Sequence, residues 1–247
     1  MTDDTWSDYE EFKTEQPLSE VYYNLVQKAI QAGVRRICGE VKLRKALDLG
    51  CGTGDLTRYL REVADSVVGV DGSTALIRKA RQHPDQEALE FLQANVLDRV
   101  AMGRLPSGAF DLVTAAWLHN YMHTEEQHRQ LLEEVLRLLA PEGRVAFLMP
   151  ADAYTSVRTQ RFAALLDWRQ AWLEEGPEWV RGVFSFAGSP WAEMTVWQPI
   201  WIAKLYRPYF SLEFIDVKSV WLDEGGLGEH ILEPTYEVMI GTRRPAD

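Results

Sequence analysis

Short apolar runs alternate with helical repeats through the first 150 residues. Each run is short enough for a buried strand, and the runs lie at residues 46–49, 67–70, 89–92, 110–115 and 144–148. Between the runs, apolar residues recur every three or four positions, as Leu56 and Leu60 do, which is typical of a helix that buries one face. Strands that alternate with helices predict an α/β protein with a parallel sheet covered on both faces.

The chain before the first strand is predicted to be helical. Leu18, Tyr22, Leu25 and Ile30 recur at helical spacing, and Gly33 follows as the predicted helix end. We therefore assign residues 1–40 to N-terminal helices that cap the sheet.

The pattern changes after residue 150. Residues 151–209 far exceed the one or two dozen residues that a simple connection between strands needs, so they predict an inserted lid or binding segment. Phe162, Leu165 and Trp172 fit one amphipathic helix in its first half. Six of the nine tryptophans fall in this segment, which favours an apolar or aromatic ligand, with a cationic amine as the alternative. Any one of these tryptophans can instead belong to a small core of the lid itself.

The chain closes with two more apolar runs, at residues 211–217 and 236–241, which predict an antiparallel pair of strands. The sequence shows no repeat, linker or low-complexity tract. We expect residues 1–247 to form one domain.

A glycine-rich turn follows the first predicted strand. Asp48 stands before a turn that contains Gly50, Gly52 and Gly54, and Asp71 ends the second predicted strand. Glycines let the backbone pass close to a ligand where a Cβ would clash. A strand, a glycine turn, a helix, a strand and an acid form a βαβ nucleotide-binding unit, and the acid can hold two ribose hydroxyls.

The dinucleotide fingerprint G-x-G-x-x-G is a close alternative. Asp55 stands where its third glycine would fall, which argues against a pyrophosphate cradle and an NAD-dependent oxidoreductase. A glycine-rich surface loop without a ligand is the remaining alternative.

The turn resembles motif I of the class I S-adenosylmethionine (AdoMet) methyltransferases, (D/E)-x-G-x-G-x-G, which is matched from Asp48 to Gly54. The resemblance covers residues 45–150. It implies a Rossmann-like, doubly wound, seven-stranded sheet with an antiparallel C-terminal strand and an inserted lid between strands five and six. It also implies AdoMet as the cofactor and S-adenosylhomocysteine as the product. The cofactor-binding residues that it implies are Asp48, Gly50, Cys51, Gly52, Gly54, Asp71, Gly72, Asn95, Val96 and Ala115.

Asn95 departs from the family pattern, which usually has Asp at that position. An amide oxygen can still accept a hydrogen bond from the adenine amino group.

The loop after the fourth predicted strand holds the candidate catalytic residues. His119 comes first, by its position and because a histidine pKa lies near neutrality, and Tyr121 follows. Histidines at this position in the family also serve only to shape the cofactor pocket. Methyl transfer mainly requires alignment of acceptor, methyl and sulfur, and a base is needed only for some acceptors. The expected acceptor-binding residues are Trp117, Tyr22, Trp191, Trp197 and Trp201.

Neither a metal nor a nucleic acid is expected at this site. Ala115 and Ala116 occupy the slot where catechol-type methyltransferases carry a metal-binding acid. The (D/N)-P-P-(Y/F) motif of the enzymes that methylate amino groups of nucleic acids is absent from the same place. A net charge of −11 and a pI near 5.0 also disfavour polyanionic partners.

The composition is that of a soluble globular protein, with 46% hydrophobic and 26% charged residues. No apolar run approaches the roughly 20 residues of a membrane span, and the acidic first residues do not resemble a secretory signal. Cys38 and Cys51 do not make a disulfide framework, so we expect a cytoplasmic protein with reduced cysteines and no membrane partner.

The sequence favours a small-molecule O- or N-methyltransferase. An AdoMet-binding protein of the same fold without methyl transfer, regulatory or cyclase-like, stays open because the glycine turn supports binding in both cases.

Overall fold

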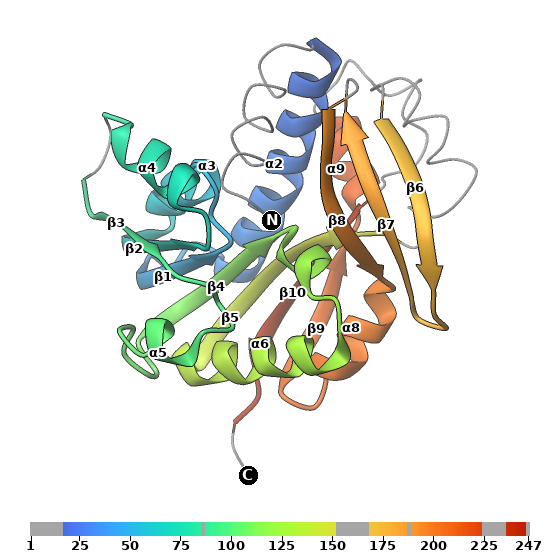
Figure 1. Cartoon of the computed structure of the whole chain (residues 1–247). Helices are drawn as coiled ribbons and strands as arrows, with labels where there is room; N and C mark the ends of the chain where they lie inside the picture. Colours follow the sequence, from blue (N-terminus) through green and yellow to red (C-terminus); the bar gives the residue numbers. More distant parts are fainter. Residues whose placement is uncertain (1–16, 85–86, 152–167, 187–188, 224–235, 246–247) are drawn as a thin grey trace.

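The computed structural model describes residues 17–84, 87–151, 168–186, 189–223 and 236–245 (Figure 1). Within these ranges only the backbone is described at residues 17–22, 168–170, 184–186, 189–192 and 221–223.

A seven-stranded sheet with the order β3-β2-β1-β4-β5-β10-β9 forms the centre of the fold. Its strands are β1 (Leu43–Leu49), β2 (Ala64–Asp71), β3 (Leu89–Gln93), β4 (Phe110–Ala116), β5 (Leu139–Pro150), β9 (Phe210–Ile215) and β10 (Tyr236–Arg243). Strands β1 to β5 pair in parallel, whereas β10 runs antiparallel to both β5 and β9. The predicted Rossmann-like sheet with an antiparallel C-terminal strand is confirmed.

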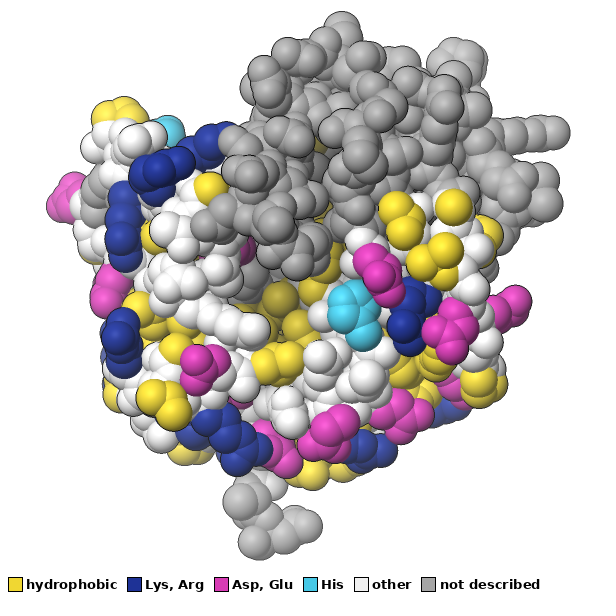
Figure 2. Space-filling model, in the orientation of Figure 1, with side chains coloured by type: hydrophobic (Ala, Val, Ile, Leu, Met, Phe, Trp, Pro, Cys, Tyr) yellow, Lys and Arg dark blue, Asp and Glu magenta, His cyan; other side chains and the backbone are white. Residues whose placement is uncertain are grey.

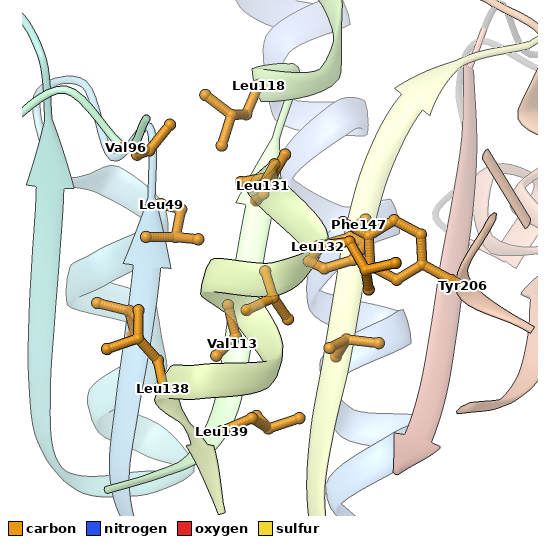
Figure 3. Packing of buried hydrophobic residues seen from close by; sticks show 14 of the residues in the cluster. Leu49, Val96, Val113, Leu118, Leu131, Leu132, Leu138, Leu139, Phe147 and Tyr206 are labelled. Carbon is orange, nitrogen blue, oxygen red and sulfur yellow. The ribbon is translucent and has the colours of Figure 1, made fainter. Parts of the chain in front are cut away.

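Helices cover both faces of this sheet, as the alternation of strands and helices predicted (Figure 1). They are α2 (Pro17–Cys38), α3 (Asp55–Tyr59), α4 (Thr74–Gln82), α5 (Arg99–Met102), α6 (Glu125–Leu138), α8 (Pro199–Tyr206) and α9 (Val217–Asp223), with short 3₁₀ turns η1 (Leu60–Glu62) and η2 (Leu118–Tyr121). The apolar side of α2 packs in one core cluster, and α6 and α8 share the other. Figure 3 shows Leu131, Leu132 and Leu138 of α6 packed over Val113 of β4 and Phe147 of β5. No helix in these described ranges has the length and apolar character needed to span a bilayer.

Helix α2 continues beyond the predicted end at Gly33 to Cys38. A Cβ at Gly33 would lie 2.6 Å from Val238 Cγ1. The glycine therefore allows the helix to lie close against β10, and the prediction that it ends the helix was wrong.

Helix α6 begins at a capping box that fixes the loop before it. Thr124 Oγ1 accepts a hydrogen bond from Gln127 N, and Gln127 Oε1 accepts one from Thr124 N, each at 3.2 Å. Gln127 Oε1 also accepts from His123 N at 2.6 Å. This box holds the end of the loop that follows β4.

A second, three-stranded antiparallel sheet lies between β5 and α8 in the sequence. It consists of β6 (Trp168–Glu175), β7 (Trp179–Phe186) and β8 (Ser189–Trp197). The helix predicted through Trp172 is therefore wrong, since Trp172 belongs to β6 and pairs with Gly182 of β7. The first part of that predicted helix, including Phe162 and Leu165, lies outside the described residues.

Candidate cofactor and acceptor site

The glycine turn between β1 and α3 is bound to β2. Gly50 N and Cys51 N donate to Val70 O at 2.8 and 3.0 Å. Gly52 has φ +55°, and a Cβ there would meet nothing within 4 Å, so the space in front of this residue is open. Gly54 has φ +88°, and a Cβ there would lie 2.7 Å from Phe91 Cζ. The turn thus packs on β3 at Gly54 and presents an open backbone surface at Gly52.

Asp71 joins the glycine turn to the start of α4. Its Oδ2 accepts a hydrogen bond from Gly52 N at 2.9 Å, and its Oδ1 accepts one from Ser73 N at 2.8 Å. Burial raises the pKa of this carboxyl group, and the two backbone donors act in the opposite direction. A carboxylate has about four acceptor positions, so two remain for a ligand.

Asp48 lies at the end of β1 and is buried, with 1% of its surface exposed. Thr57 Oγ1 donates to its Oδ2 at 2.7 Å, and Thr114 Oγ1 donates to its Oδ1 at 2.9 Å. Burial raises its pKa to about 7, against the effect of the two hydroxyl donors. The carboxyl group therefore connects β1, α3 and β4 directly beneath the glycine turn.

The loop after β3 lies beside Asp71. Ala94 N donates to Asp71 O at 2.9 Å, and Gln93 Nε2 donates to Gly72 O at 3.0 Å. The Asn95 side chain is exposed, and its Oδ1 accepts from Leu97 N at 2.9 Å. Val96, by contrast, is buried. The structure thus brings Gly72, Asn95 and Val96 together near Asp71.

Val96 and Leu118 gather with Leu49 at the C-terminal end of β1 (Figure 3). The same core cluster includes Ala115 of β4. These residues lie at the edge of the sheet where open α/β folds bind ligands.

N-terminal helix α2 also reaches this edge. The hydroxyl of Tyr23 donates to Asp55 Oδ2 at 2.8 Å, so α2 contacts the residue that follows the glycine turn. The side chain of Tyr22, a predicted acceptor residue, lies outside the described residues.

Trp117 directly precedes η2 and has a left-handed backbone, with φ +63°. Its N–H donates to Leu148 O at 2.9 Å, and its ring packs edge-on against Tyr236 at 5.9 Å between centroids. Trp117 therefore joins the loop after β4 to β5 and β10. Its predicted contact with an acceptor stays a prediction.

His119 is buried, with 1% of its surface exposed. Its ring stacks on His128 of α6 with 5.3 Å between centroids and 9° between planes, and the two Nδ1 atoms are 3.3 Å apart. Phe147 and Tyr206 pack edge-on against it. Burial lowers the pKa of His119 to about 4, so the imidazole is neutral. This enclosure favours a pocket-lining or structural role of His119 over a base role, and Tyr121 packs partly buried against the core cluster that contains Phe147 and Tyr206.

Three contacts bind the end of η2 and the residues after it to strand β8. Asn120 Nδ2 donates to Met194 Sδ at 3.6 Å, Trp197 Nε1 donates to Met122 O at 2.7 Å, and His123 Nδ1 lies 2.9 Å from Thr195 Oγ1. Sequence reasoning missed Met194 and Thr195, because only the pairing in three dimensions brings β8 against the loop.

The predicted tryptophans of residues 151–209 lie in different surroundings. Trp197 is buried, and its ring lies 4.4 Å from that of Trp201 and 4.9 Å from that of His128. Trp201 also lines a groove of about 420 Å³ between α6 and α8. The side chain of Trp191 lies outside the described residues. The structure thus brings Trp197 and Trp201 together beside His128 of α6.

The visible face of the molecule carries no unbroken basic surface among its described residues. Figure 2 shows acidic and basic side chains interspersed along the lower margin of this face.

Residues 46–143 match a family model described as a methyltransferase domain. The chain is similar to demethylmenaquinone methyltransferase of Thermus thermophilus, with 37% identity over 51% of this chain and 60% of that protein. It is also similar to trans-aconitate 2-methyltransferase of Escherichia fergusonii, with 29% identity over 72% of this chain and 68% of that protein. The chain thus spans less than two thirds of the quinone methyltransferase that it matches.

A solved structure described as the DhpI-SAM-HEP complex has the same fold, with a TM-score of 0.61 and 22% identity over 98% of this chain and 93% of that one. Residues 46–143, which match the family model, contain the glycine turn, Asp71, Asn95 and η2. Residues 46–143 of the chain therefore resemble a methyltransferase domain, and the chain has the same fold as the solved structure described with SAM.

Proposed function

We propose that this protein transfers a methyl group from AdoMet to an oxygen or nitrogen atom of a small aromatic or apolar molecule. The observation that carries the proposal is the Asp71 carboxylate, which is fixed by Gly52 N beside a turn with open space in front of it. Relatives named as methyltransferases, and a neighbour of the same fold described with SAM, support AdoMet as the cofactor.

The residues at the strand ends fit AdoMet. Asp71 has acceptor positions left for the ribose hydroxyls, and the exposed Asn95 and the neighbouring Val96 lie next to it for the adenine. Gly52 presents open backbone that the methionine part can approach, and the buried Asp48 bonds to Thr57 and Thr114 next to the turn. AdoMet supplies a methyl group that its sulfonium has already activated.

The reaction needs alignment more than acid–base chemistry. The bond from the methyl carbon to sulfur breaks and leaves its electron pair on sulfur, while a lone pair of the acceptor forms the new bond to carbon. An O–H or N–H acceptor then loses its proton to solvent. Holding both partners in line accounts for most of the rate enhancement in such a displacement.

The acceptor is proposed to bind between η2 and the second sheet. Trp117 lies on the η2 side, and β8 is bound to the loop through Met194, Thr195 and Trp197. The relative named for demethylmenaquinone supports an aromatic acceptor, whereas the one named for trans-aconitate supports a carboxylate oxygen.

Calorimetry with AdoMet, S-adenosylhomocysteine and NAD tests the cofactor. We expect Asp71→Ala to lose roughly 1.5–3 kcal/mol of AdoMet binding, about 10- to 150-fold in Kd, because the ribose hydroxyls lose a charged acceptor. Asp65→Ala, which removes an exposed acid of the same strand, is the matched control and should bind as the wild type does. Tight NAD binding, or no binding of AdoMet by the wild type, would contradict the proposal.

Formation of S-adenosylhomocysteine with 1,4-naphthohydroquinone and with trans-aconitate tests the acceptor class. The proposal expects faster turnover of the naphthohydroquinone. A protein that binds AdoMet but turns over neither compound favours the alternative of an AdoMet-binding protein without methyl transfer.

A further inference from the structure

Asn120 lies between the two halves of the proposed site. It belongs to η2, which directly follows β4, and its side chain contacts β8 of the second sheet. Only 2% of its surface is exposed. Two neighbouring contacts, from Met122 to Trp197 and from His123 to Thr195, hold β8 against the same loop.

The two ends of the Asn120 amide differ in their partners. Nδ2 donates to Met194 Sδ at 3.6 Å, whereas Oδ1 is buried and has no hydrogen-bond partner among the residues that the structure describes. The thioether can only accept, so it orients the amide with its nitrogen toward β8. Buried polar atoms in native proteins are almost always paired, so an unpaired amide oxygen at the end of a ligand-binding strand calls for a donor from outside the chain.

We propose that Asn120 is a positioning residue whose Oδ1 accepts a hydrogen bond from the O–H or N–H group of the acceptor that is methylated. The proposal rests on the proposed function. A carboxamide does not take up a proton near neutral pH, so Asn120 orients the nucleophile and leaves the proton for solvent. The hydrogen bond turns the lone pair of the acceptor toward a fixed direction, which is the alignment that an in-line displacement requires.

This role also defines a preference among acceptors. A molecule with a hydroxyl or N–H at the reacting atom satisfies the buried oxygen, whereas one with an ether or tertiary amine there leaves it unpaired. Sites built around a buried hydrogen-bonding group discriminate strongly against ligands that lack the partner.

Asn120→Leu provides the test, since it keeps the side-chain size and removes the unpaired oxygen. In the absence of ligands, its melting temperature should equal or exceed that of the wild type, because a buried atom without a partner has been replaced by an apolar one. Its kcat/KM for 1,4-naphthohydroquinone should fall 10- to 100-fold, while the Kd values for AdoMet and S-adenosylhomocysteine stay within twofold. Gln82→Leu, which replaces an exposed amide at the end of α4, is the matched control and should leave all four quantities unchanged.

A direct binding measurement separates this inference from the proposed function. With S-adenosylhomocysteine bound, the wild type should bind 1,4-naphthohydroquinone at least tenfold more tightly than 1,4-dimethoxynaphthalene, and Asn120→Leu should bind the two within threefold of each other. A wild type that does not distinguish the two compounds overturns the role of Asn120. So does a drop of several degrees in the melting temperature of Asn120→Leu, or a tenfold loss of AdoMet affinity, which would assign the oxygen to the fold or to the cofactor. Failure of the proposed function would show instead as loss of AdoMet binding by the wild type.

Discussion

Asp48 and His119 are two titratable side chains buried near the same strand ends, and burial shifts their pKa values in opposite directions. The pKa of Asp48 rises to about 7, and that of His119 falls to about 4. Both shifts keep the side chain uncharged over a wider pH range, because burial disfavours the charged form. Each shift makes the stability of the fold depend on pH, with opposite sign.

Replacement of Asp48 by Asn should remove the part of the pH dependence of stability that is due to Asp48. Between pH 4 and 7 the folded state holds a proton on Asp48 that the unfolded state has released, so the free energy of unfolding falls as pH rises, by at most about 1.4 kcal/mol per pH unit. Above pH 7 neither state holds the proton, and the dependence ends. Urea unfolding of wild type and Asp48→Asn from pH 5 to 8 should show the variant gaining relative stability up to pH 7 and then a constant difference.

The histidines are present in both proteins and cancel in this comparison. Their lowered pKa values act the other way, because stability is lost as pH falls below about 6.5 and the unfolded state takes up protons first. Parallel pH profiles for wild type and Asp48→Asn would contradict a raised Asp48 pKa.

Sequence reasoning predicted the glycine turn and the position of Asp71 beside it, but it could not place His119. Motif spacing fixes Asp48, the three glycines and Asp71, because these residues act through the local βαβ unit. The surroundings of His119 depend on His128 in α6 and Tyr206 in α8, which are nine and 87 positions away in the sequence. The position of His119 in the loop after β4 does not by itself predict that its side chain is buried.

Strand β8 is the element that binds the second sheet to the loop after β4, and Trp197 makes its central contact. The Trp197 ring is buried, and its N–H bonds to Met122 O at 2.7 Å. We expect Trp197→Ala to lose about 3–5 kcal/mol of stability through the cavity it leaves. Trp197→Phe should lose about 1–3 kcal/mol, because the Met122 carbonyl is then unpaired.

Urea unfolding monitored by circular dichroism measures both losses. Leu173→Ala, at a residue of β6 that is 60% exposed, serves as the control and should change stability by no more than about 0.5 kcal/mol. Equal stability of Trp197→Ala and wild type would show that β8 is not bound to the loop as described.

The elements of this region were the hardest to predict from the sequence. The apolar spacing at Trp172 and Leu173 fits a helix, but pairing with β7 decides the outcome, and a pairing between strands is invisible to local periodicity. Helix α8 was missed although Pro199 at its first turn is a recognised start signal. The parallel strands β1, β2, β4 and β5, by contrast, were predictable because each contains a short apolar run that is buried.

At the scale of the whole molecule, we expect methyl transfer to be independent of a divalent metal. Ala115 and Ala116 stand where a metal-binding acid would be needed, and in the described part of the chain no three His, Cys, Asp or Glu side chains come together as a metal site. Excess EDTA should therefore change the rate of S-adenosylhomocysteine formation by less than twofold. A loss of activity that added Mg²⁺ or Zn²⁺ restores would overturn this expectation.

The position of β10 has a consequence for the order in which the chain folds during synthesis. Although it is the last described strand in the sequence, β10 lies inside the sheet and bonds to β5 on one side and β9 on the other. When the nascent chain has emerged from the ribosome only as far as β9, β10 has not yet been made. The edges of β5 and β9 that will pair with β10 are then without their hydrogen-bond partners. The half that holds the glycine turn can form its parallel pairs earlier, because β1 to β5 are all complete by residue 150. Translation thus separates the assembly of the cofactor half from closure of the sheet, and a pause before residue 236 would prolong exposure of edges that other chains can join.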